Sequence, residues 1–453
     1  MVAYSIKRAI FKPTREGYYV MKRNLKTRLV DRKIKKPNPF LMAISRCVLG
    51  IVCKVNKVKF NYNFDIDGLD DKPVVLLATH TSRLEFMYTL YGFRRNNINM
   101  VCGYQNILKK GIYWLFRKLG IISKYLYQPD FKCTKNMLGV LKRNGALGLF
   151  PEGIQSTSGS TQPINPATTK FIKKSKAYVV LCTSQGTYMT TNRYSSDRKK
   201  GYIALNYSIL FTPQTLALMT EEQIYERLLQ KFKYNEFEFN KQARHKYIGK
   251  KPNAHGLNKI LYKCPDCKRE HVMEVVGEEI RCRACKFSAR VNEYYDLVEF
   301  KGNNKPSSID AWYKWQRNCV REEIARDNFK MMLSGRFYTI KLDRLRKPPK
   351  NRKLLSVGEL YLNNKKLCFL GTIKGKGNGY HFDMKSIYSL TFSTKGFLEF
   401  YHNDDYYIFV PDDKTQDLIK WTLASEEIHN LYDEKWRVAC EDVYDYDKGE
   451  IYG

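Results

Sequence analysis

The sequence contains no apolar run long enough to cross a bilayer. Its most apolar stretch, Phe40 to Val55, is 16 residues long and contains Arg46 and Lys54, whereas a spanning helix needs about 20 apolar residues. The stretch suits an interfacial helix or a helix of the protein core. The N-terminal residues also lack the apolar region and the cleavage site of a signal peptide. We therefore expect any membrane contact to be peripheral and to lie on the cytoplasmic face.

Acidic residues are scarce. The 453 residues include 45 acidic and 79 basic side chains, which gives a net charge of +34 spread along the chain. A net positive charge this large indicates that the protein binds an anionic partner, either nucleic acid or a surface of anionic lipid headgroups. The sequence lacks the RNP-type, helix-turn-helix and aromatic-platform patterns of nucleic-acid-binding domains. These absences favour an anionic membrane surface over nucleic acid.

Most of the 12 cysteines have no spacing that suits a metal ion. We interpret these eight as small hydrophobic residues in a reducing compartment, without disulfides. The other four form two Cys-x2-Cys pairs, Cys264 with Cys267 and Cys282 with Cys285, separated by 14 residues. Four thiolates at this spacing predict a structural zinc site with no open coordination position, and iron is the minor alternative.

Two short stretches each begin as an apolar run and then break abruptly into polar residues. They are Val74 to Glu85 (VVLLATHTSRLE) and Leu147 to Ser160 (LGLFPEGIQSTSGS). Apolar runs of this kind are typical of buried strands. Ligands of α/β sheets bind at the carboxyl ends of strands. The loops that carry His80 and Glu152 are therefore candidate site loops.

His80 and Glu85 have the spacing and the chemistry of a general base with its orienting carboxylate. Histidine exchanges a proton near neutral pH, and a carboxylate on its second ring nitrogen holds the tautomer and stabilises the imidazolium. A structural alternative is a capping box at a helix start, in which Ser82 and Glu85 only satisfy backbone N–H groups. The pair alone leaves both interpretations open.

An ordered set of motifs resembles the glycerolipid acyltransferases typified by 1-acylglycerol-3-phosphate acyltransferase. That family has Asn-His-x4-Asp, a Gly-containing block ending near a basic residue, Phe-Pro-Glu-Gly-Thr-Arg-Ser, and an apolar strand with Pro. Over residues 40–245 this sequence has, in the same order, His80 with Glu85, Lys109-Lys110-Gly111 to Lys124, Phe150-Pro151-Glu152-Gly153-Ile154-Gln155-Ser156, and Tyr178 to Thr183.

The resemblance implies an O-acyltransferase of phospholipid biosynthesis. It would move an acyl chain from acyl-CoA or acyl-carrier protein to the hydroxyl of a lysophospholipid or acylglycerol phosphate, without a catalytic cofactor. His80 would be the catalytic base and Glu85 its orienting carboxylate. The residues implied in acceptor binding are Lys124, Glu152, Gly153 and Gln155.

Four positions depart from the family pattern. Thr79 stands where the family has Asn, Glu85 where it has Asp, and Val180 where it has Pro. Gln155 replaces the Arg that would hold the acceptor's phosphate. A neutral amide binds phosphate less strongly than a guanidinium, so the sequence predicts acyl transfer but leaves the acceptor open.

The remaining sequence predicts further domains. The Cys pairs and a following amphipathic helix, predicted over 308–334, resemble the zinc-ribbon extension of some bacterial family members. Short strands with turns at Asn363-Asn364 and Asn403-Asp404, followed by one helix, resemble pleckstrin-homology (PH) and GRAM domains. Their lysines suit either anionic lipid or a solvated surface; they are Lys365, Lys366, Lys374 and Lys376.

We therefore expect an α/β protein with appended domains. The expected parts are a basic N-terminal segment with an interfacial helix (1–56), an acyltransferase α/β sandwich (57–250), a zinc ribbon (251–300), a helical connector (301–345), a PH/GRAM-like β domain (354–435) and an acidic tail (436–453). Two rival functions remain. One is a catalytically weak lipid-binding scaffold, and the other is a zinc-ribbon protein that binds nucleic acid.

Overall fold

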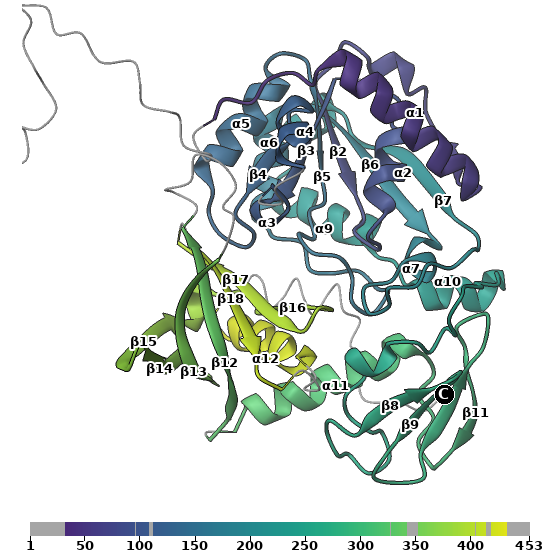
Figure 1. Cartoon of the computed structure of the whole chain (residues 1–453). Helices are drawn as coiled ribbons and strands as arrows, with labels where there is room; N and C mark the ends of the chain where they lie inside the picture. Colours follow the sequence, from purple (N-terminus) through teal and green to yellow (C-terminus); the bar gives the residue numbers. More distant parts are fainter. Residues whose placement is uncertain are drawn as a thin grey trace, which may run out of the picture.

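The computed structural model describes residues 32–95, 97–107, 112–326, 328–341, 352–403, 405–413 and 418–432. Within these ranges the chain forms three β-sheets, of which the first has helices on both faces (Figure 1). Helices and strands alternate in the first part, so the expected α/β class is confirmed there. Several predictions fall outside the described residues. They concern residues 1–31 of the N-terminal segment, Lys109-Lys110-Gly111, most of the stretch between the helical connector and the PH/GRAM-like domain (346–353), and the tail at 436–453.

The first sheet has seven strands in the order β1-β7-β6-β2-β5-β3-β4. The strands are β1 (Lys59–Tyr62), β2 (Val74–Ala78), β3 (Ile98–Gly103), β4 (Ile122–Lys124), β5 (Ala146–Leu149), β6 (Tyr178–Gln185) and β7 (Ala204–Phe211). β2 to β6 are parallel, whereas β7 is antiparallel to β6 and pairs in parallel with β1. The carboxyl ends of β2 to β6 therefore meet at one edge of the sheet.

Helices cover both faces of this sheet, as the expected sandwich requires (Figure 1). The helices in this part of the chain are α1 (Pro39–Val55), η2 (Asp67–Leu69), α2 (Glu85–Gly92), α3 (Tyr104–Ile107), α4 (Tyr113–Lys118), α5 (Phe131–Leu141), α6 (Ala167–Ser175), α7 (Thr187–Thr190), α8 (Pro213–Leu218), α9 (Glu221–Phe232) and α10 (Glu236–Ala243). Alternate side chains of β2 enter two cores. Val74 and Leu76 pack with α1 and α2, whereas Val75 and Leu77 pack with α5, α6 and α9. β2 is therefore apolar at every position.

Helix α1 has an apolar face that no described part of the chain covers. Its buried side chains, Met42 and Cys53, contact the sheet. The exposed apolar residues recur every three or four positions and so share one face; they are Phe40, Ile44, Val48, Ile51 and Val55. In the part of the chain that the structure describes, every helix falls short of the length and hydropathy that a bilayer span requires.

The second sheet is small and antiparallel, in the order β11-β10-β9-β8. Its elements are η3 (Leu257–Lys259), β8 (Met273–Val276), β9 (Glu279–Cys282), β10 (Ser288–Val291) and β11 (Leu297–Lys301). The β8–β9 hairpin separates the two Cys-x2-Cys pairs and brings them to the same end of the sheet. We call this part the ribbon.

The third sheet is antiparallel, in the order β15-β14-β13-β12-β18-β17-β16. Its elements are β12 (Lys330–Lys341), β13 (Lys353–Asn363), β14 (Lys366–Ile373), β15 (Lys376–Asp383), η5 (Met384–Ser386), β16 (Thr391–Ser393), β17 (Phe397–His402), β18 (Asp405–Pro411) and α12 (Ile419–Asn430). We call it the C-terminal sheet. Strands followed by one helix are the order that the sequence predicts, while the assignment to PH or GRAM domains stays a prediction.

The helix predicted over 308–334 is too long. The helix α11 spans Ile309–Ile324, and the residues after it form β12. β12 pairs with β13 on one side and β18 on the other, and alternate side chains such as Leu333 and Phe337 are buried. The C-terminal sheet therefore begins before residue 354, where the sequence placed its boundary. Backbone hydrogen bonds on both edges of β12 outweigh its helical propensity.

Helix α11 joins the ribbon to the C-terminal sheet (Figure 1). Buried Arg317 of α11 donates to Glu426 at 2.5 Å and to Glu427 at 2.9 Å, both on α12. A second cluster joins lysines and glutamates of the ribbon, α11 and α12; its members are Lys263, Glu270, Glu323 and Lys420. These ion pairs are largely buried, so removing one partner would leave a costly unpaired charge.

The C-terminal sheet also contacts the α/β domain next to the carboxyl edge of the first sheet. Gln128 Nε2 donates to the carbonyl oxygen of Tyr401 at 2.7 Å, and the rings of Tyr127 and Tyr388 lie 4.3 Å apart. A shared apolar cluster, which includes Tyr125 and Ile408, continues this contact. The C-terminal sheet is therefore a neighbour of the candidate site.

Candidate active site

His80 and Glu85 lie together at the carboxyl end of β2. His80 follows the strand, and Glu85 is the first residue of α2. His80 Nδ1 lies 2.5 Å from Glu85 Oε1, and the Glu85 side chain is completely buried. The second oxygen, Oε2, accepts the backbone N–H of Ser82. Glu85 therefore holds the backbone of Ser82 with one oxygen, as the capping-box interpretation expects, and the imidazole with the other, so the two interpretations of the sequence are compatible.

Glu85 holds one ring nitrogen of His80, so Nε2 is the nitrogen that remains to act on a substrate. Glu85 holds Nδ1, and the His80 side chain is 25% exposed. The imidazole also lies 4.7 Å from the ring of Phe150, which limits its rotation. A histidine held in one tautomer with an accessible Nε2 has the geometry of a general base.

Glu152 ties the two site loops together. Its Oε1 accepts the backbone N–H of His80 at 2.8 Å, and its Oε2 accepts the N–H of Gln162 at 2.8 Å and the hydroxyl of Tyr234 at 3.2 Å. Burial raises the pKa of this carboxyl to about 7, although these donors oppose the shift. Both oxygens are held by protein groups, so a direct contact between Glu152 and the acceptor stays a prediction.

Gly153 and Gln155 lie in the loop after β5, next to the His80 loop. Gly153 has φ of +78°, a left-handed conformation that favours glycine. Gln155 Nε2 lies 3.4 Å from the carbonyl oxygen of Thr81 and 3.5 Å from that of Thr191. The N–H of Ser156 donates to the carbonyl oxygen of His80 at 2.7 Å. The structure thus brings the His80 and Phe-Pro-Glu-Gly loops into direct contact.

Lys124 lies farther from His80. It ends β4, and two strands, β5 and β3, separate β4 from β2. Three strand spacings correspond to about 14 Å. Lys124 Nζ lies 3.4 Å from the carbonyl oxygen of Gln128. Lys124 therefore shares the carboxyl edge of the sheet with His80 without contacting it.

Arg193 is a cation at this loop that the sequence analysis did not identify. Its Nη1 lies 3.5 Å from the carbonyl oxygen of Gln155 and 3.4 Å from Thr157 Oγ1, and its Nη2 donates to the carbonyl oxygen of Phe392 at 2.6 Å. Burial lowers the pKa of Arg193. No local motif marks this residue, because its place depends on how α7 and the C-terminal sheet meet the loop.

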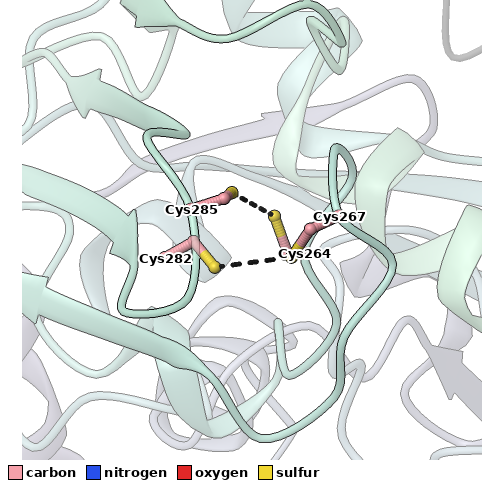
Figure 2. A group of neighbouring side chains, drawn as sticks. All are labelled: Cys264, Cys267, Cys282 and Cys285. Atoms are coloured by element: carbon pink, nitrogen blue, oxygen red, sulfur yellow. Dashed lines mark hydrogen bonds between the residues drawn. The ribbon is translucent and has the colours of Figure 1, made fainter.

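The four predicted metal ligands come together in the ribbon, as Figure 2 shows. The Sγ atoms of Cys264 and Cys285 are 3.7 Å apart, those of Cys267 and Cys282 are 3.8 Å apart, and all four lie within 4.8 Å of one another. A zinc–sulfur bond of about 2.3 Å requires sulfur atoms about 3.8 Å apart at the corners of a tetrahedron. The cluster therefore fits a metal ion such as zinc.

Comparison of the sequence with known proteins finds a similarity to an acyltransferase. No family model matches the chain. A chloroplastic 1-acyl-sn-glycerol-3-phosphate acyltransferase of Brassica napus is 27% identical over 139 residues, which cover 28% of this chain and 38% of that protein. The chain therefore spans well under half the length of this curated relative.

Among solved structures, the chain is similar to the crystal structure of the 1-acyl-sn-glycerophosphate (LPA) acyltransferase PlsC from Thermotoga maritima. The TM-score is 0.37 and the identity 16%, over 42% of this chain and 76% of that chain. The resemblance itself depends on the motifs and the sequence match. Over the length of that match, the resemblance to the 1-acylglycerol-3-phosphate acyltransferase family is confirmed.

Proposed function

We propose that the chain is a peripheral membrane O-acyltransferase that acylates the hydroxyl of a lysophospholipid or acylglycerol phosphate. The observation that carries the proposal is the pairing of His80 with buried Glu85 at 2.5 Å, beside the Phe-Pro-Glu-Gly loop. The sequence match to a 1-acyl-sn-glycerol-3-phosphate acyltransferase supports the reaction class.

The proposed reaction begins with a proton transfer. His80 Nε2 takes the proton of the acceptor hydroxyl, and Glu85 stabilises the imidazolium that forms. The oxygen attacks the carbonyl carbon of the thioester and gives a tetrahedral oxyanion, which backbone N–H groups of the strand-end loops would stabilise. The carbon–sulfur bond then breaks, and the leaving thiolate takes the proton from the imidazolium. The ester is the product, and His80 returns to its neutral state.

The zinc site has a structural part in this proposal. Four thiolates complete a tetrahedral shell and leave no position for substrate or water. A metal bound there would hold the two ends of the ribbon hairpin together, and no catalytic step involves it.

The apolar face of α1 supports membrane association. Its exposed residues include Val48 and Ile51, which are 52% and 65% exposed. Such a face, combined with a net charge of +34, suits a helix that lies in the headgroup region of an anionic membrane. The lysines at the outer hairpins of the C-terminal sheet, Lys365 and Lys374 among them, are exposed and would add to this attraction.

We expect the double variant Val48→Ser, Ile51→Ser to bind anionic vesicles at least about tenfold more weakly, because two apolar side chains leave the interface. Co-sedimentation with vesicles containing phosphatidylglycerol measures the binding. The matched control is Leu218→Ser on α8, where the leucine is 87% exposed outside this face. Vesicle binding equal to that of the unaltered protein would exclude α1 as the membrane contact.

Acyl transfer by the purified protein tests the proposed function. Labelled acyl-CoA and acyl-carrier protein would each be offered with lysophosphatidic acid, neutral lysolipids and monoacylglycerol. Ester formation with one of these acceptors supports the proposal. The preferred acceptor shows whether a phosphate-bearing acceptor is still used when Gln155 stands in place of the family's Arg. No transfer to any acceptor, from folded protein that contains zinc, would favour the lipid-binding scaffold instead.

A further inference from the structure

The Phe-Pro-Glu-Gly loop is long, polar and buried. It comprises residues 150–166, which lead from β5 to α6 without a helix or a strand, and its residues 156–164 are buried throughout. Most of this buried part is Ser, Thr or Gly, and Ile164 is its one large apolar side chain. Apolar packing therefore contributes little to the conformation of the loop, and hydrogen bonds have to fix it.

This loop holds His80 by both of its backbone groups. The N–H of His80 donates to Glu152 Oε1 at 2.8 Å, and its carbonyl oxygen accepts the N–H of Ser156 at 2.7 Å. His80 lies between the end of β2 and the start of α2, so neither group is bonded within a strand or a helix. The position of the imidazole therefore depends on the conformation of the loop.

The far part of the loop is attached to α11, which lies outside the α/β domain in the sequence. The side chain of Asp310 on α11 is 2% exposed, and its Oδ1 accepts the hydroxyl of Ser160 at 2.8 Å. The carbonyl oxygen of Ser160 accepts the hydroxyl of Ser156 at 2.6 Å. Three hydrogen bonds in sequence therefore connect Asp310, through Ser160 and Ser156, to the carbonyl oxygen of His80.

The near part of the loop is attached to the C-terminal sheet by Arg193. Nη2 of Arg193 donates to the carbonyl oxygen of Phe392 on β16 at 2.6 Å, and the guanidinium lies 4.6 Å from the centre of the Phe392 ring. Nη1 faces the loop, at 3.4 Å from Thr157 Oγ1 and 3.5 Å from the carbonyl oxygen of Gln155. The planar, forked guanidinium can hold both sides at once.

The two attachment points belong to one hydrogen-bonded unit. The segment before β16 is bonded to α12, because the N–H of Leu390 donates to Ser425 Oγ at 2.8 Å and the hydroxyl of Ser389 donates to Glu426 Oε1 at 2.9 Å. Glu426 also forms the buried ion pair with Arg317 of α11. A shift of α11 or of the C-terminal sheet would therefore reach the loop at both points.

We propose that Asp310 and Arg193 are positioning residues for His80, through which α11 and the C-terminal sheet fix the Phe-Pro-Glu-Gly loop and the loop fixes the histidine. The inference rests on the proposed acyl transfer and goes beyond it, because it makes the chain after residue 250 necessary for chemistry at His80. The competing explanation is that these contacts only dock one domain on another.

Three variants of the full chain cut the attachments: Asp310→Ala, Ser160→Ala and Arg193→Met. Each is expected to lower kcat about 10–10²-fold, the cost of a misplaced catalytic group, and to leave KM for donor and acceptor almost unchanged. Ser160→Ala changes a single hydroxyl and is the variant that disturbs folding least. Asp310→Asn preserves an oxygen that can accept from Ser160, so it should lose less activity than Asp310→Ala.

The matched controls break a contact between the α/β domain and the ribbon away from the loop. Arg244 follows α10, and its Nη1 lies 2.7 Å from Asp296 Oδ2. Arg244→Met and Asp296→Asn should leave kcat as it is in the unaltered protein. A loss in these controls as large as in the three variants would favour domain docking over positioning.

Combination with His80→Ala separates positioning from a general structural effect. A residue that acts by placing the imidazole has nothing to place once the imidazole is gone. Asp310→Ala should therefore leave the residual rate of the His80→Ala protein unchanged, whereas a structural role would lower the rate in both backgrounds.

Amide hydrogen exchange measures the attachment without catalysis. Peptides that cover residues 150–162 are expected to exchange about tenfold faster in Asp310→Ala and Arg193→Met, because each variant removes hydrogen bonds to a charged group. Peptides of β2 and β5 should exchange as in the unaltered protein.

The proposal would be overturned by a kcat equal to that of the controls, by an equal loss in the absence of His80, or by unchanged exchange of the loop. It can also fail separately from the proposed function. An active enzyme whose kcat is unaffected by the three variants rejects the positioning role alone. If the unaltered protein transfers no acyl chain, the acyl-transfer proposal fails, and loop exchange then decides whether α11 and the C-terminal sheet hold the loop.

Discussion

Replacing His80 by alanine is expected to lower the rate of acyl transfer by about 10²–10⁴-fold, the usual contribution of a general base. The loss should fall on kcat, because the imidazole acts as the hydroxyl proton leaves and contributes little to binding of the acceptor. Removal of His80 also leaves the buried Glu85 carboxylate without this partner, so a lower melting temperature is expected and the rates are compared at a temperature at which both proteins are folded. The measurement is the initial rate with the best acceptor found for the unaltered protein.

Two companion variants make this experiment decisive. Glu85→Gln preserves an oxygen that can cap the start of α2 but removes the charge that stabilises the imidazolium. It should therefore reduce kcat while folding is maintained. His402→Ala, in the C-terminal sheet, controls for loss of a histidine in general. Activity of His80→Ala equal to that of the His402 variant would show that the His80–Glu85 pair is only a structural contact.

Exchanging the four ribbon cysteines for serine is expected to unfold the middle of the chain. Binding of structural zinc by small domains is worth about 10–16 kcal/mol near neutral pH, and this free energy is coupled to folding. The ribbon strands are short, and their apolar residues belong to a core that continues through α11 into the C-terminal sheet. We therefore expect the damage to extend to α12 as well as the ribbon.

Metal analysis and limited proteolysis measure this effect. The unaltered protein should contain one zinc ion per chain, and the variant none, with rapid cleavage between β8 and β11. Cys47→Ser, at an exposed position of α1, is the matched control. Iron in place of zinc would appear as colour. A serine variant that resists protease as well as the control does would show that the cysteines need no metal to hold the ribbon.

The sequence predicts best those strands whose side chains are buried on both faces of the sheet. β2 lies within the apolar run predicted from Val74, and β5, which ends at Leu149, covers the start of the run predicted from Leu147. Buried parallel strands leave a continuous apolar pattern that few other structures produce. β12 is a strand that the sequence does not predict. It is half-buried, so apolar and polar residues are mixed in it as they are in the preceding helix α11. Only its pairing with β13 and β18 identifies it as a strand.

The candidate site divides in the same way. His80 and Glu85 are five residues apart in one strand-to-helix turn. Their contact can therefore be predicted from the sequence. The contact of Arg193 with the Gln155 loop depends on packing between separate segments. A groove along the β4 edge of the first sheet likewise combines residues 32–36 with α4 and α5, which only the folded sheet brings together. The sequence spacing of two residues predicts a contact only when they are close in the chain. The Arg193 contact and the groove can be found only from the tertiary structure.

The position of β12 also restricts how the chain can be divided. β12 ends at Lys341, before the boundary that the sequence predicts at residue 354, yet it lies between β13 and β18 in the C-terminal sheet. A fragment that starts at residue 354 would lose this central strand and expose two long unpaired strand edges. Such edges pair with other molecules, so this fragment should precipitate on expression. A fragment that starts at α11 would retain both the strand and the helix that buries its apolar neighbours.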